Sequence, residues 1–314
     1  LGLRGDKSAR DVIAETAAPA MKIRVRLTHP DKVLFPEAGV TKAELAAYLD
    51  MAAARMGPFI YGRPVSLVRA PDGVGKQTFF QKHAMAGMPD AIKTTPIKEK
   101  TKTEDYLTLP NATALVSCAQ ISALEFHLWG SRNDDLEHPD RLVFDLDPDE
   151  ELDFQVVKRA AFDIKALLES ADLRSFAMIT GGKGIHVVLH LKRKHSWEEV
   201  KGFSGAFAEQ IEALDPKRFV ANMAKARRKG RIFVDYLRNG RGATAIAPYS
   251  PRAKGTAPVA VPVSWNELKT IPTANVFKLK DMAARLAEPD PWADYAKSAV
   301  TITKATRSKL GLAS

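Results

Sequence analysis

Residues 143–148 read Val-Phe-Asp-Leu-Asp-Pro, so apolar and acidic side chains alternate up to a proline. In a β-strand, side chains two residues apart point to the same face. Asp145 and Asp147 then project together, while Phe144 and Leu146 turn toward a core. Neighbouring carboxylates repel unless a cation neutralises them, and sites with oxygen donors only suit Mg²⁺ or Mn²⁺. The stretch therefore predicts a metal site at the end of a strand, with a solvated strand end as the alternative.

On both sides of this strand, the sequence predicts helices and strands in mixed order. Short alternating or apolar runs predict strands at 23–27, 78–82, 113–117, 142–146, 175–179, 186–191 and 232–237, and a turn followed by a strand over 58–69. Helices are predicted at 42–55, 154–170 and 197–214, and residues 93–108 are predicted to be a charged loop. Thr41 is the expected N-cap of the first helix, with Glu44 as its capping-box partner. No strand–helix turn carries a glycine-rich fingerprint, which disfavours a doubly wound sheet.

A third acid, Asp235, lies in the apolar stretch Ile-Phe-Val-Asp-Tyr at 232–236. A carboxylate without a partner is costly to bury in such a strand. Arg231 or Arg238 could supply an ordinary ion pair. Together with the first two acids, however, Asp235 completes the three-carboxylate set that holds two metal ions in phosphoryl-transfer enzymes, polymerases and nucleases alike.

The stretch at 180–186 reads Thr-Gly-Gly-Lys-Gly-Ile-His. Three glycines allow successive backbone N–H groups to converge on an anion, and Lys183 adds a positive charge. The spacing is not that of a Walker motif, and a strand rather than a helix follows. A hairpin turn is the ordinary interpretation of such a run. With His186 at the start of the next strand, the run instead resembles a cradle for a triphosphate.

Four further residues are candidates on weaker grounds. Phe79 and Phe80 are adjacent on a predicted strand, so one is expected to fill the core while the other is free to stack on a base. His127 lies among apolar residues and is interpreted as a core histidine. Arg252 lies in a proline-framed loop that suits a guanidinium directed at phosphate, with plain surface exposure as the alternative.

The chain of 314 residues carries 47 lysines and arginines against 37 acids, a net charge of +10. Such an excess favours a polyanionic partner, with nucleic acid first. Residues 217–241 alone hold nine basic residues against one acid, a surface that a DNA backbone beside the metals would need. No apolar run approaches about 18 residues, and the one cysteine, Cys118, cannot form an internal disulfide. We therefore expect no membrane partner and a location in the cytoplasm.

These motifs together resemble a known family. The order Asp145-Leu146-Asp147-Pro148, then 181–186, then Asp235 is that of the three motifs of the archaeo-eukaryotic primase superfamily. Wider matches resemble the polymerase module of bacterial end-joining DNA ligases: His-Pro-Asp-Lys-Val-Leu-Phe-Pro at 29–36, Phe-Phe-Gln-Lys at 79–82, Leu-Glu-Phe-His at 124–127 and Tyr-Ser-Pro-Arg-Ala at 249–253. The resemblance covers about 21–292. One departure is Thr180, where serine is expected, and it keeps the hydroxyl.

The resemblance implies an α+β, primase-like fold of two facing mixed or antiparallel sheets with flanking helices, whose catalytic half is RNA-recognition-like. It predicts a polymerase domain over 21–295, divided into an N-terminal part at 21–138 and a catalytic part at 139–295. Residues 1–20 are polar and alanine-rich and are predicted to be a linker, and 296–314 a basic C-terminal tail or linker. The chain is thus expected to be a module of a longer polypeptide.

The resemblance also implies a role for individual side chains. Two Mn²⁺ ions, or Mg²⁺, would be held by Asp145, Asp147 and Asp235. The substrate NTP or dNTP would be bound by Thr180, Lys183, Gly184, His186, His127 and Arg252. DNA would be contacted by Phe79 and Phe80 at the template, by Lys32 and Lys42 at a 5′-phosphate, and by Arg228 at the primer terminus or template.

The expected activity is a template-dependent nucleotidyl transfer that fills gaps and extends ends in double-strand break repair by non-homologous end joining, with a preference for ribonucleotides. A primer 3′-OH would attack the α-phosphate in line and release pyrophosphate. The expected partners are primer–template DNA, DNA ends with a 5′-phosphate, nucleoside triphosphates, ligase and nuclease modules of the same polypeptide, and Ku, on the bacterial nucleoid.

Two other functions are compatible with the same residues. A two-metal nuclease would use the three carboxylates with water as the nucleophile, and a non-catalytic nucleic-acid-binding module would use the basic surface alone. The glycine-rich turn favours a polymerase over a nuclease, because hydrolysis of a phosphodiester needs no triphosphate site. The three carboxylates disfavour the silent module.

Overall fold

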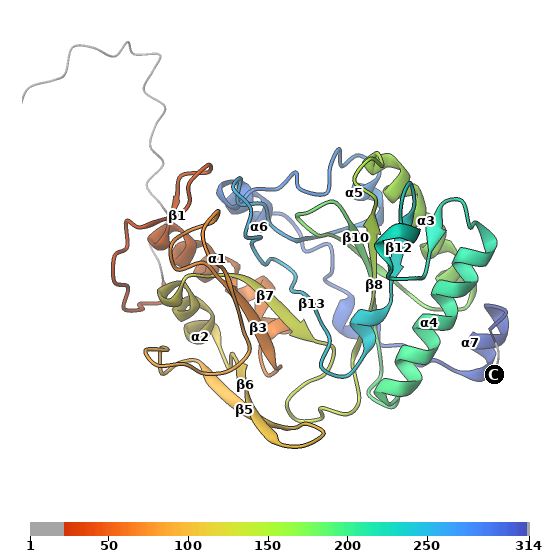
Figure 1. Ribbon diagram of the computed structural model, residues 1–314, viewed down its shortest axis with the longest axis horizontal. Coiled ribbons are helices and arrows are strands. Elements are labelled where there is room, and N and C mark those ends of the chain that lie inside the picture. The colour runs from red at the N-terminus through yellow and green to blue at the C-terminus, as the bar shows by residue number, and fades with distance from the viewer. Residues whose placement is uncertain (1–21, 313–314) are drawn as a thin grey trace, which may run out of the picture.

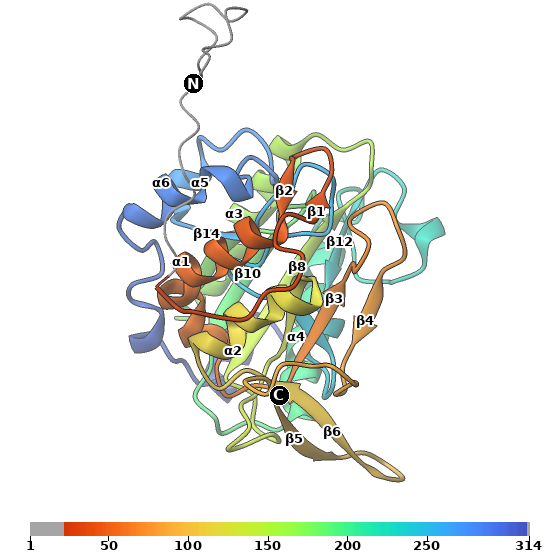
Figure 2. The same ribbon diagram turned by 90° about the vertical axis from the view of Figure 1, so that its left-hand side faces the viewer.

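The computed structural model describes residues 22–312. Two β-sheets face each other in the middle of the molecule, with α1 and α2 beyond one sheet and α3 and α4 beyond the other (Figures 1 and 2). In chain order the elements are β1 (Val33–Phe35), β2 (Val40–Thr41), α1 (Lys42–Ile60), β3 (Val65–Arg69), β4 (Phe79–Gln81), β5 (Lys93–Lys98), β6 (Thr103–Thr108), α2 (Ala112–Ser117), β7 (Ala123–Trp129), β8 (Arg141–Pro148), α3 (Phe154–Ser170), β9 (Phe176–Ile179), β10 (Ile185–His190), α4 (Trp197–Leu214), β11 (Phe219–Val220), β12 (Ile232–Asp235), β13 (Thr244–Ile246), β14 (Val261–Val263), α5 (Trp265–Leu268), α6 (Met282–Ala287) and α7 (Lys304–Lys309).

The larger sheet has six strands in the order β11-β12-β8-β10-β9-β14. Only β11 and β12 pair in parallel, so the sheet is mixed. Within it, β8, α3, β9, β10, α4 and β12 form a βαββαβ unit with β8 and β10 at its centre. That connectivity and strand order are those of an RNA-recognition-like sheet. The predicted α+β architecture of two facing sheets, with an RNA-recognition-like half, is confirmed.

Strand β8 separates apolar from acidic side chains, as its alternation predicts. Phe144 and Leu146 are fully buried, and the ring centroid of Phe144 lies 4.9 Å from that of Phe207 on α4. Asp145 and Asp147, which alternate with these two residues, lie on the opposite face of the strand. Register then brings partners to the acids: Asp145 lies opposite His186 on β10 and opposite Asp235 on β12.

Helices α3 and α4 begin and end at the predicted residues because both have strong N-caps. The carboxylate of Asp153 accepts a hydrogen bond from the Gln155 backbone, and Ser196 forms a capping box with Glu199. Helix α1 has the predicted capping box at Thr41 but extends to Ile60, beyond its predicted end. No helix within residues 22–312 is long and apolar enough to cross a membrane.

The smaller sheet has four antiparallel strands in the order β13-β7-β3-β4. Strand β7 pairs on one side with β3 and on the other with β13, so that His127 lies between Ser66 and Ile246. Leu124 and Phe126 point into the main core. The side chains that alternate with them, Glu125 and His127, share the other face of the strand.

Three local predictions are wrong. Residues 113–117 lie in helix α2, which Asn111 caps through a hydrogen bond from the Ala114 backbone. A short apolar run fits a buried helix as well as a strand, and the cap is what distinguishes them. Residues 93–108 form the hairpin β5–β6, because threonines and Tyr106 favour strands and Ile97 packs with Trp129. Residues 23–27 form no strand, although alternate side chains are half-buried against the core.

The predicted tail at 296–314 is also wrong up to residue 312. The chain there pairs with the end of β10, where the Val300 backbone donates a hydrogen bond to the His190 carbonyl at 2.9 Å. It continues into α7, and Ile302, Leu310 and Leu312 are buried. Single apolar residues scattered through a basic stretch show no hydrophobic period, so the sequence did not predict that these three pack in the core. The linker predicted at 1–20 lies outside the described residues.

Candidate active site

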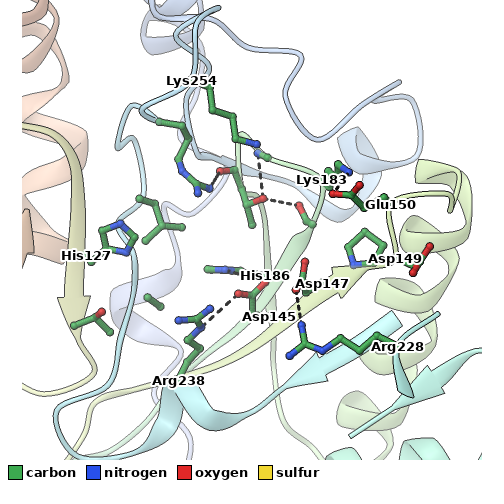
Figure 3. Close-up of a pocket in the computed structure, with 18 of the residues that line it drawn as sticks. His127, Asp145, Asp147, Asp149, Glu150, Lys183, His186, Arg228, Arg238 and Lys254 are labelled. Carbon is green, nitrogen blue, oxygen red and sulfur yellow. Dashed lines mark hydrogen bonds and ion pairs between the residues drawn. The ribbon is translucent and has the colours of Figure 1, made fainter. Parts of the chain in front are cut away.

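A cleft of about 590 Å³ lies between the two sheets. Strands β8 and β10 supply one wall, β7 and β13 supply the other, and the turn at 180–184 lies at one end (Figure 3). The lining residues are His127, Asp145, Asp147, Pro148, Asp149, Glu150, Thr180, Gly182, Lys183, Gly184, His186, Lys225, Arg228, Arg238, Thr244, Ala245, Ile246, Arg252 and Lys254. Residues that are far apart in the sequence therefore meet at one site.

The three acids singled out from the sequence lie together on β8 and β12, and each has a cationic partner. Arg238 bridges two of them, with its Nε 3.1 Å from Asp235 Oδ2 and 3.5 Å from Asp145 Oδ2. Arg228 Nη1 lies 3.1 Å from Asp147 Oδ2. The ordinary ion pair that the sequence allowed for Asp235 is thus present, and it is shared with a second acid. Asp235 itself is buried and is not among the residues that line the cleft.

These partners set different pKa values for the three carboxylates. Burial and the charge of Asp145 raise the pKa of Asp147. Burial raises the pKa of Asp235, and the charge of Arg238 only partly opposes this rise. Burial acts in the same direction on Asp145, but the imidazole of His186, 3.4 Å from its Oδ1, and nearby arginines outweigh it and lower its pKa. Around Asp147 and Asp235, the nearby positive charge is therefore too weak to offset the effect of burial on the pKa.

The donor chemistry suits a hard divalent cation, although the side chains do not now converge on one. Within residues 22–312, no three histidine, cysteine, aspartate or glutamate side chains form a group arranged to hold a metal ion. The three acids instead pair with arginines, Asp147 with Arg228 and the other two with Arg238. The carboxylate oxygens on two adjacent strands are nevertheless the ligand type that Mg²⁺ and Mn²⁺ prefer.

The glycine-rich turn is closed by its threonine. Thr180 Oγ1 accepts a hydrogen bond from the Gly182 backbone at 3.3 Å and donates one to the Gly184 carbonyl at 3.1 Å. Gly181 has φ of +68°, which only glycine adopts without strain. A Cβ on Gly184 would lie 2.4 Å from the Leu146 carbonyl oxygen, so this glycine lets β10 approach β8. The serine-to-threonine departure leaves the turn intact.

The cationic end of the cleft is built from side chains on both sheets. Arg252 Nη1 donates a hydrogen bond to the Thr180 carbonyl at 2.7 Å, and its Nε donates one to Glu125 Oε1 at 3.1 Å. His127 lines the cleft and pairs with the same glutamate, so the interpretation as a core histidine is wrong. Lys183 Nζ lies 3.3 Å from Glu150 Oε1, a surface pair at the cleft rim.

The two phenylalanines on β4 both face solvent, with Phe79 41% and Phe80 54% exposed. The expectation that one fills the core is therefore wrong; both rings lie on β4, the edge strand of the smaller sheet. The Phe80 ring lies edge-on to His127, with centroids 5.8 Å apart. Two exposed aromatic rings beside a cationic cleft are suited to stacking on bases.

Lys32 and Lys42 lie close together but away from the cleft. Lys32 lines a separate hollow of about 400 Å³ with His29 and Asp31, and its ammonium pairs with Asp72 at 3.1 Å. Lys42 is only 5% exposed and donates hydrogen bonds to the carbonyls of Thr28 and Gln120. Burial and the charge of Lys32 lower the pKa of Lys42.

Sequence reasoning did not assign a role to three residues of the site. Arg238 was considered only as a pairing partner, Lys254 follows the proline-framed loop, and Glu125 stands two residues before His127. The spacing of Glu125 and His127 on a strand was the available signal, since it places both on one face. The contact of that face with a loop more than 120 residues away could not be read from the pattern.

A βαββαβ sheet with clustered acids on its open face, opposite a second sheet, defines a primase-like nucleotidyltransferase domain. A family model described as "LigD, primase-polymerase domain" matches residues 41–292. The chain belongs to this family, which confirms the resemblance seen in its motifs.

Individual relatives agree with this assignment. The multifunctional non-homologous end joining protein LigD of Pseudomonas aeruginosa is 39% identical over 330 residues, which cover 99% of this chain and 39% of that protein. The LigD of Mycolicibacterium smegmatis is 35% identical over 84% of this chain and 35% of that protein. A solved structure, the polymerase domain from Mycobacterium tuberculosis Ligase D in complex with DNA, has a TM-score of 0.81 and 30% identity, and the match covers 88% of this chain and 99% of that one. The chain thus spans well under half the length of these LigD proteins.

Proposed function

We propose that this chain is a template-dependent nucleotidyltransferase that fills gaps and extends broken DNA ends in non-homologous end joining. The observation that carries the proposal is one cleft that holds paired carboxylates on β8 and, a strand away, a glycine-rich turn ringed by cations. A site for triphosphate next to a site for metal is what nucleotidyl transfer needs. Family membership supports it.

The triphosphate is bound by the cationic end of the cleft. The Lys183 ammonium supplies charge from the turn at 180–184, and Arg252 and Lys254 add charge from the loop that follows β13. The N–H groups of Thr180, Gly181 and Gly182 already donate hydrogen bonds within the protein, so they fix the shape of the turn. Gly182 brings the backbone close, because a Cβ there would lie 3.6 Å from both Arg252 Nη1 and Lys254 Nζ. His127 closes the side nearest the edge strand β4.

Asp145, Asp147 and Asp235 would hold two Mn²⁺ or Mg²⁺ ions. Such ions supply charge that stabilises the attacking and leaving oxygens of an in-line displacement. Of the three acids, only Asp145 is favoured as an anion by the protein itself, because His186 and Arg238 lower its pKa, whereas the raised pKa values of Asp147 and Asp235 leave their charge to be stabilised by a cation. Arg228 and Arg238 now pair with the carboxylate oxygens that a metal ion would bind. Each arginine would therefore have to release a carboxylate before the ion could bind there.

DNA lies along the basic and aromatic rim of the cleft. Lys225 and Arg228 supply phosphate contacts at one side, and the exposed rings of Phe79 and Phe80 supply a stacking surface for the template at the other. The similar polymerase domain of Mycobacterium tuberculosis Ligase D was solved in complex with DNA, which supports DNA as a partner. The hollow at Lys32 is the proposed site for a 5′-phosphate.

The partners follow from the longer relatives. The matched proteins are described as multifunctional or bifunctional end-joining proteins, which supports ligase and nuclease modules in the same polypeptide. Ku, a cytoplasmic and nucleoid location, and the preference for ribonucleotides are proposed from the family resemblance alone. Competing NTP and dNTP in one extension reaction tests the last of these.

One incubation tests the activity. A labelled primer–template with Mn²⁺ and nucleotides should lengthen; shortening would indicate a nuclease, and an unchanged primer a silent binding module. Asp147→Asn should abolish the extension, because it removes a proposed metal ligand. Asp149→Asn is the matched control, since Asp149 lines the same cleft outside the three-acid set and should retain activity.

A further inference from the structure

Glu125 is a buried carboxylate that contacts two residues of the cleft lining, His127 and Arg252. Its side chain is 10% exposed, and it shares the cleft-side face of β7 with His127. The main core begins on the other face of the strand, where Leu124 and Phe126 are fully buried. A carboxylate here is costly unless it has several partners.

The partners of Glu125 are three hydrogen-bond donors that belong to the site. His127 Nε2 lies 2.9 Å from Oε2, whereas Arg252 Nε and the Ala253 backbone lie 3.1 and 2.8 Å from Oε1. Burial alone would raise the pKa of Glu125. The hydrogen bond from His127 and the charge of Arg252 outweigh it and lower the pKa to about 2. The glutamate is therefore an anion at every pH at which DNA is handled.

These contacts fix the direction of the guanidinium. Arg252 uses Nε on Glu125 and Nη1 on the Thr180 carbonyl, so it spans from the four-stranded sheet to the glycine-rich turn. Within the described residues, Nη2 carries no hydrogen bond, which leaves its two hydrogens for a phosphate. A planar guanidinium held at two points presents the third in one orientation.

We propose that Glu125 is the positioning residue of the triphosphate site: it holds His127 and Arg252 together across the gap between the two sheets, so that both reach the same nucleotide. This inference rests on the proposed function. Glu125 touches neither substrate nor metal in this scheme. It acts through His127 and Arg252, and the segment after Arg252 is fixed by the same carboxylate through the Ala253 backbone.

The test compares Glu125→Gln with wild type in primer extension and in nucleotide titration. Glutamine has the same shape but no charge, so we expect KM for the nucleotide to rise by about tenfold or more, the scale of one charged hydrogen bond. The turnover number at saturation and the affinity for DNA should change little, whereas the melting temperature should fall, because His127 and Arg252 lose a charged partner. Binding of a fluorescent nucleoside triphosphate should weaken in parallel with KM. Glu267→Gln, which removes an arginine-paired carboxylate beside Arg285, should lower the melting temperature without changing KM.

A double-mutant cycle distinguishes positioning from simple packing. If Glu125 acts through His127 and Arg252, Glu125→Gln should add nothing in a His127→Ala/Arg252→Ala background. Additive losses, an unchanged KM in the single variant, or a fall in stability that carries turnover and DNA binding down with it would overturn the inference. Wild-type protein that binds nucleotide and extends a primer confirms the proposed function in each case, so the two can fail separately.

Discussion

At the scale of single residues, the site balances repelling acids with arginines. Asp145 has a lowered pKa because His186 and Arg238 favour its charge, whereas Asp147 has a raised pKa because burial and Asp145 oppose its charge. A lowered carboxylate pKa stabilises the fold above the unfolded-state pKa, and a raised one does the opposite. Two acids on the same strand therefore have opposite effects on stability before any metal binds.

Asparagine at each position should separate these effects. In buffer with a chelator, Asp145→Asn should lower the free energy of unfolding by about 1–3 kcal/mol, since it leaves buried partners of a charged hydrogen bond unpaired. Asp147→Asn should leave the melting temperature unchanged or slightly raised, because it removes the repelling partner. Both should abolish primer extension. Equal destabilisation by the two variants, measured by thermal melting, would contradict the electrostatic account.

Alanine substitutions at two glycines of the turn at 180–184 should have different effects, one on stability and the other on nucleotide binding. Gly184→Ala would place a Cβ 2.4 Å from a backbone oxygen of β8, so we expect a loss of about 1–3 kcal/mol in stability. Gly182→Ala would place a Cβ 3.3 Å from Thr180 Oγ1 and at ordinary contact distance, 3.6 Å, from Arg252 Nη1 and Lys254 Nζ, so it should fold normally but crowd the phosphates. Melting curves and KM for the nucleotide check the pair. A stable Gly184→Ala protein with wild-type KM would show that the close strand approach is not required.

At the scale of elements, local signals decided what could be predicted. Helices α3 and α4 were predicted to the residue because each combines a long apolar period with a side-chain cap. The hairpin β5–β6 was missed because its strands are polar on most positions and its few apolar residues pack against Trp129, far along the chain. Helix α2 was missed because six residues are too few to show a helical period.

The C-terminal segment gives the prediction at this scale. Residues 299–312 bury Ile302, Leu310 and Leu312 and bring Arg307 over the ring of Phe203 on α4. A chain that ends at residue 298 should lose about 1.5–3 kcal/mol for each of the three buried side chains, as an upper bound. Urea unfolding measures the loss, and removal of residues 1–20 offers a comparison of similar length. An unchanged midpoint after removal of 299–314 would restore the interpretation of this segment as a linker.

At the scale of the whole molecule, the cleft exists because two sheets from different parts of the chain face each other. The acids and the glycine-rich turn lie on one sheet, and each could be proposed from its own short motif. For the second sheet, His127 and Arg252 were assigned to the nucleotide only through the family resemblance, and Glu125 was not assigned. Residue patterns alone did not connect these side chains, since they become one unit only when β7 meets a loop that follows β13. His127 was misassigned to the core for that reason. A sequence pattern can predict which side chains share one face of a strand or helix, but the contact between two such faces depends on the tertiary fold.

The last prediction concerns the second hollow, away from the cleft, where a recessed 5′-phosphate is proposed to bind. Lys32 is the side chain available to it, with His29 beside it and Asp72 as a competing partner at 3.1 Å. Lys42 contributes differently from the sequence-based expectation: its ammonium is held by two carbonyls, so it anchors the start of α1 and adds positive charge from beneath.

Gapped DNA with a 5′-phosphate should therefore bind more tightly than the same DNA with a 5′-hydroxyl. Lys32→Ala should lose that preference and about one unit of salt slope, without a change in melting temperature. Lys42→Ala should lose the preference together with stability, and the double variant should shed about one to two units of slope. Asp72→Asn should strengthen the preference, because it frees the Lys32 ammonium for the phosphate. Extension of a primer–template without a downstream strand should be the same in all four variants. Equal affinity of the wild-type protein for phosphorylated and unphosphorylated gaps would leave a primase-like polymerase whose recognition of DNA ends lies elsewhere.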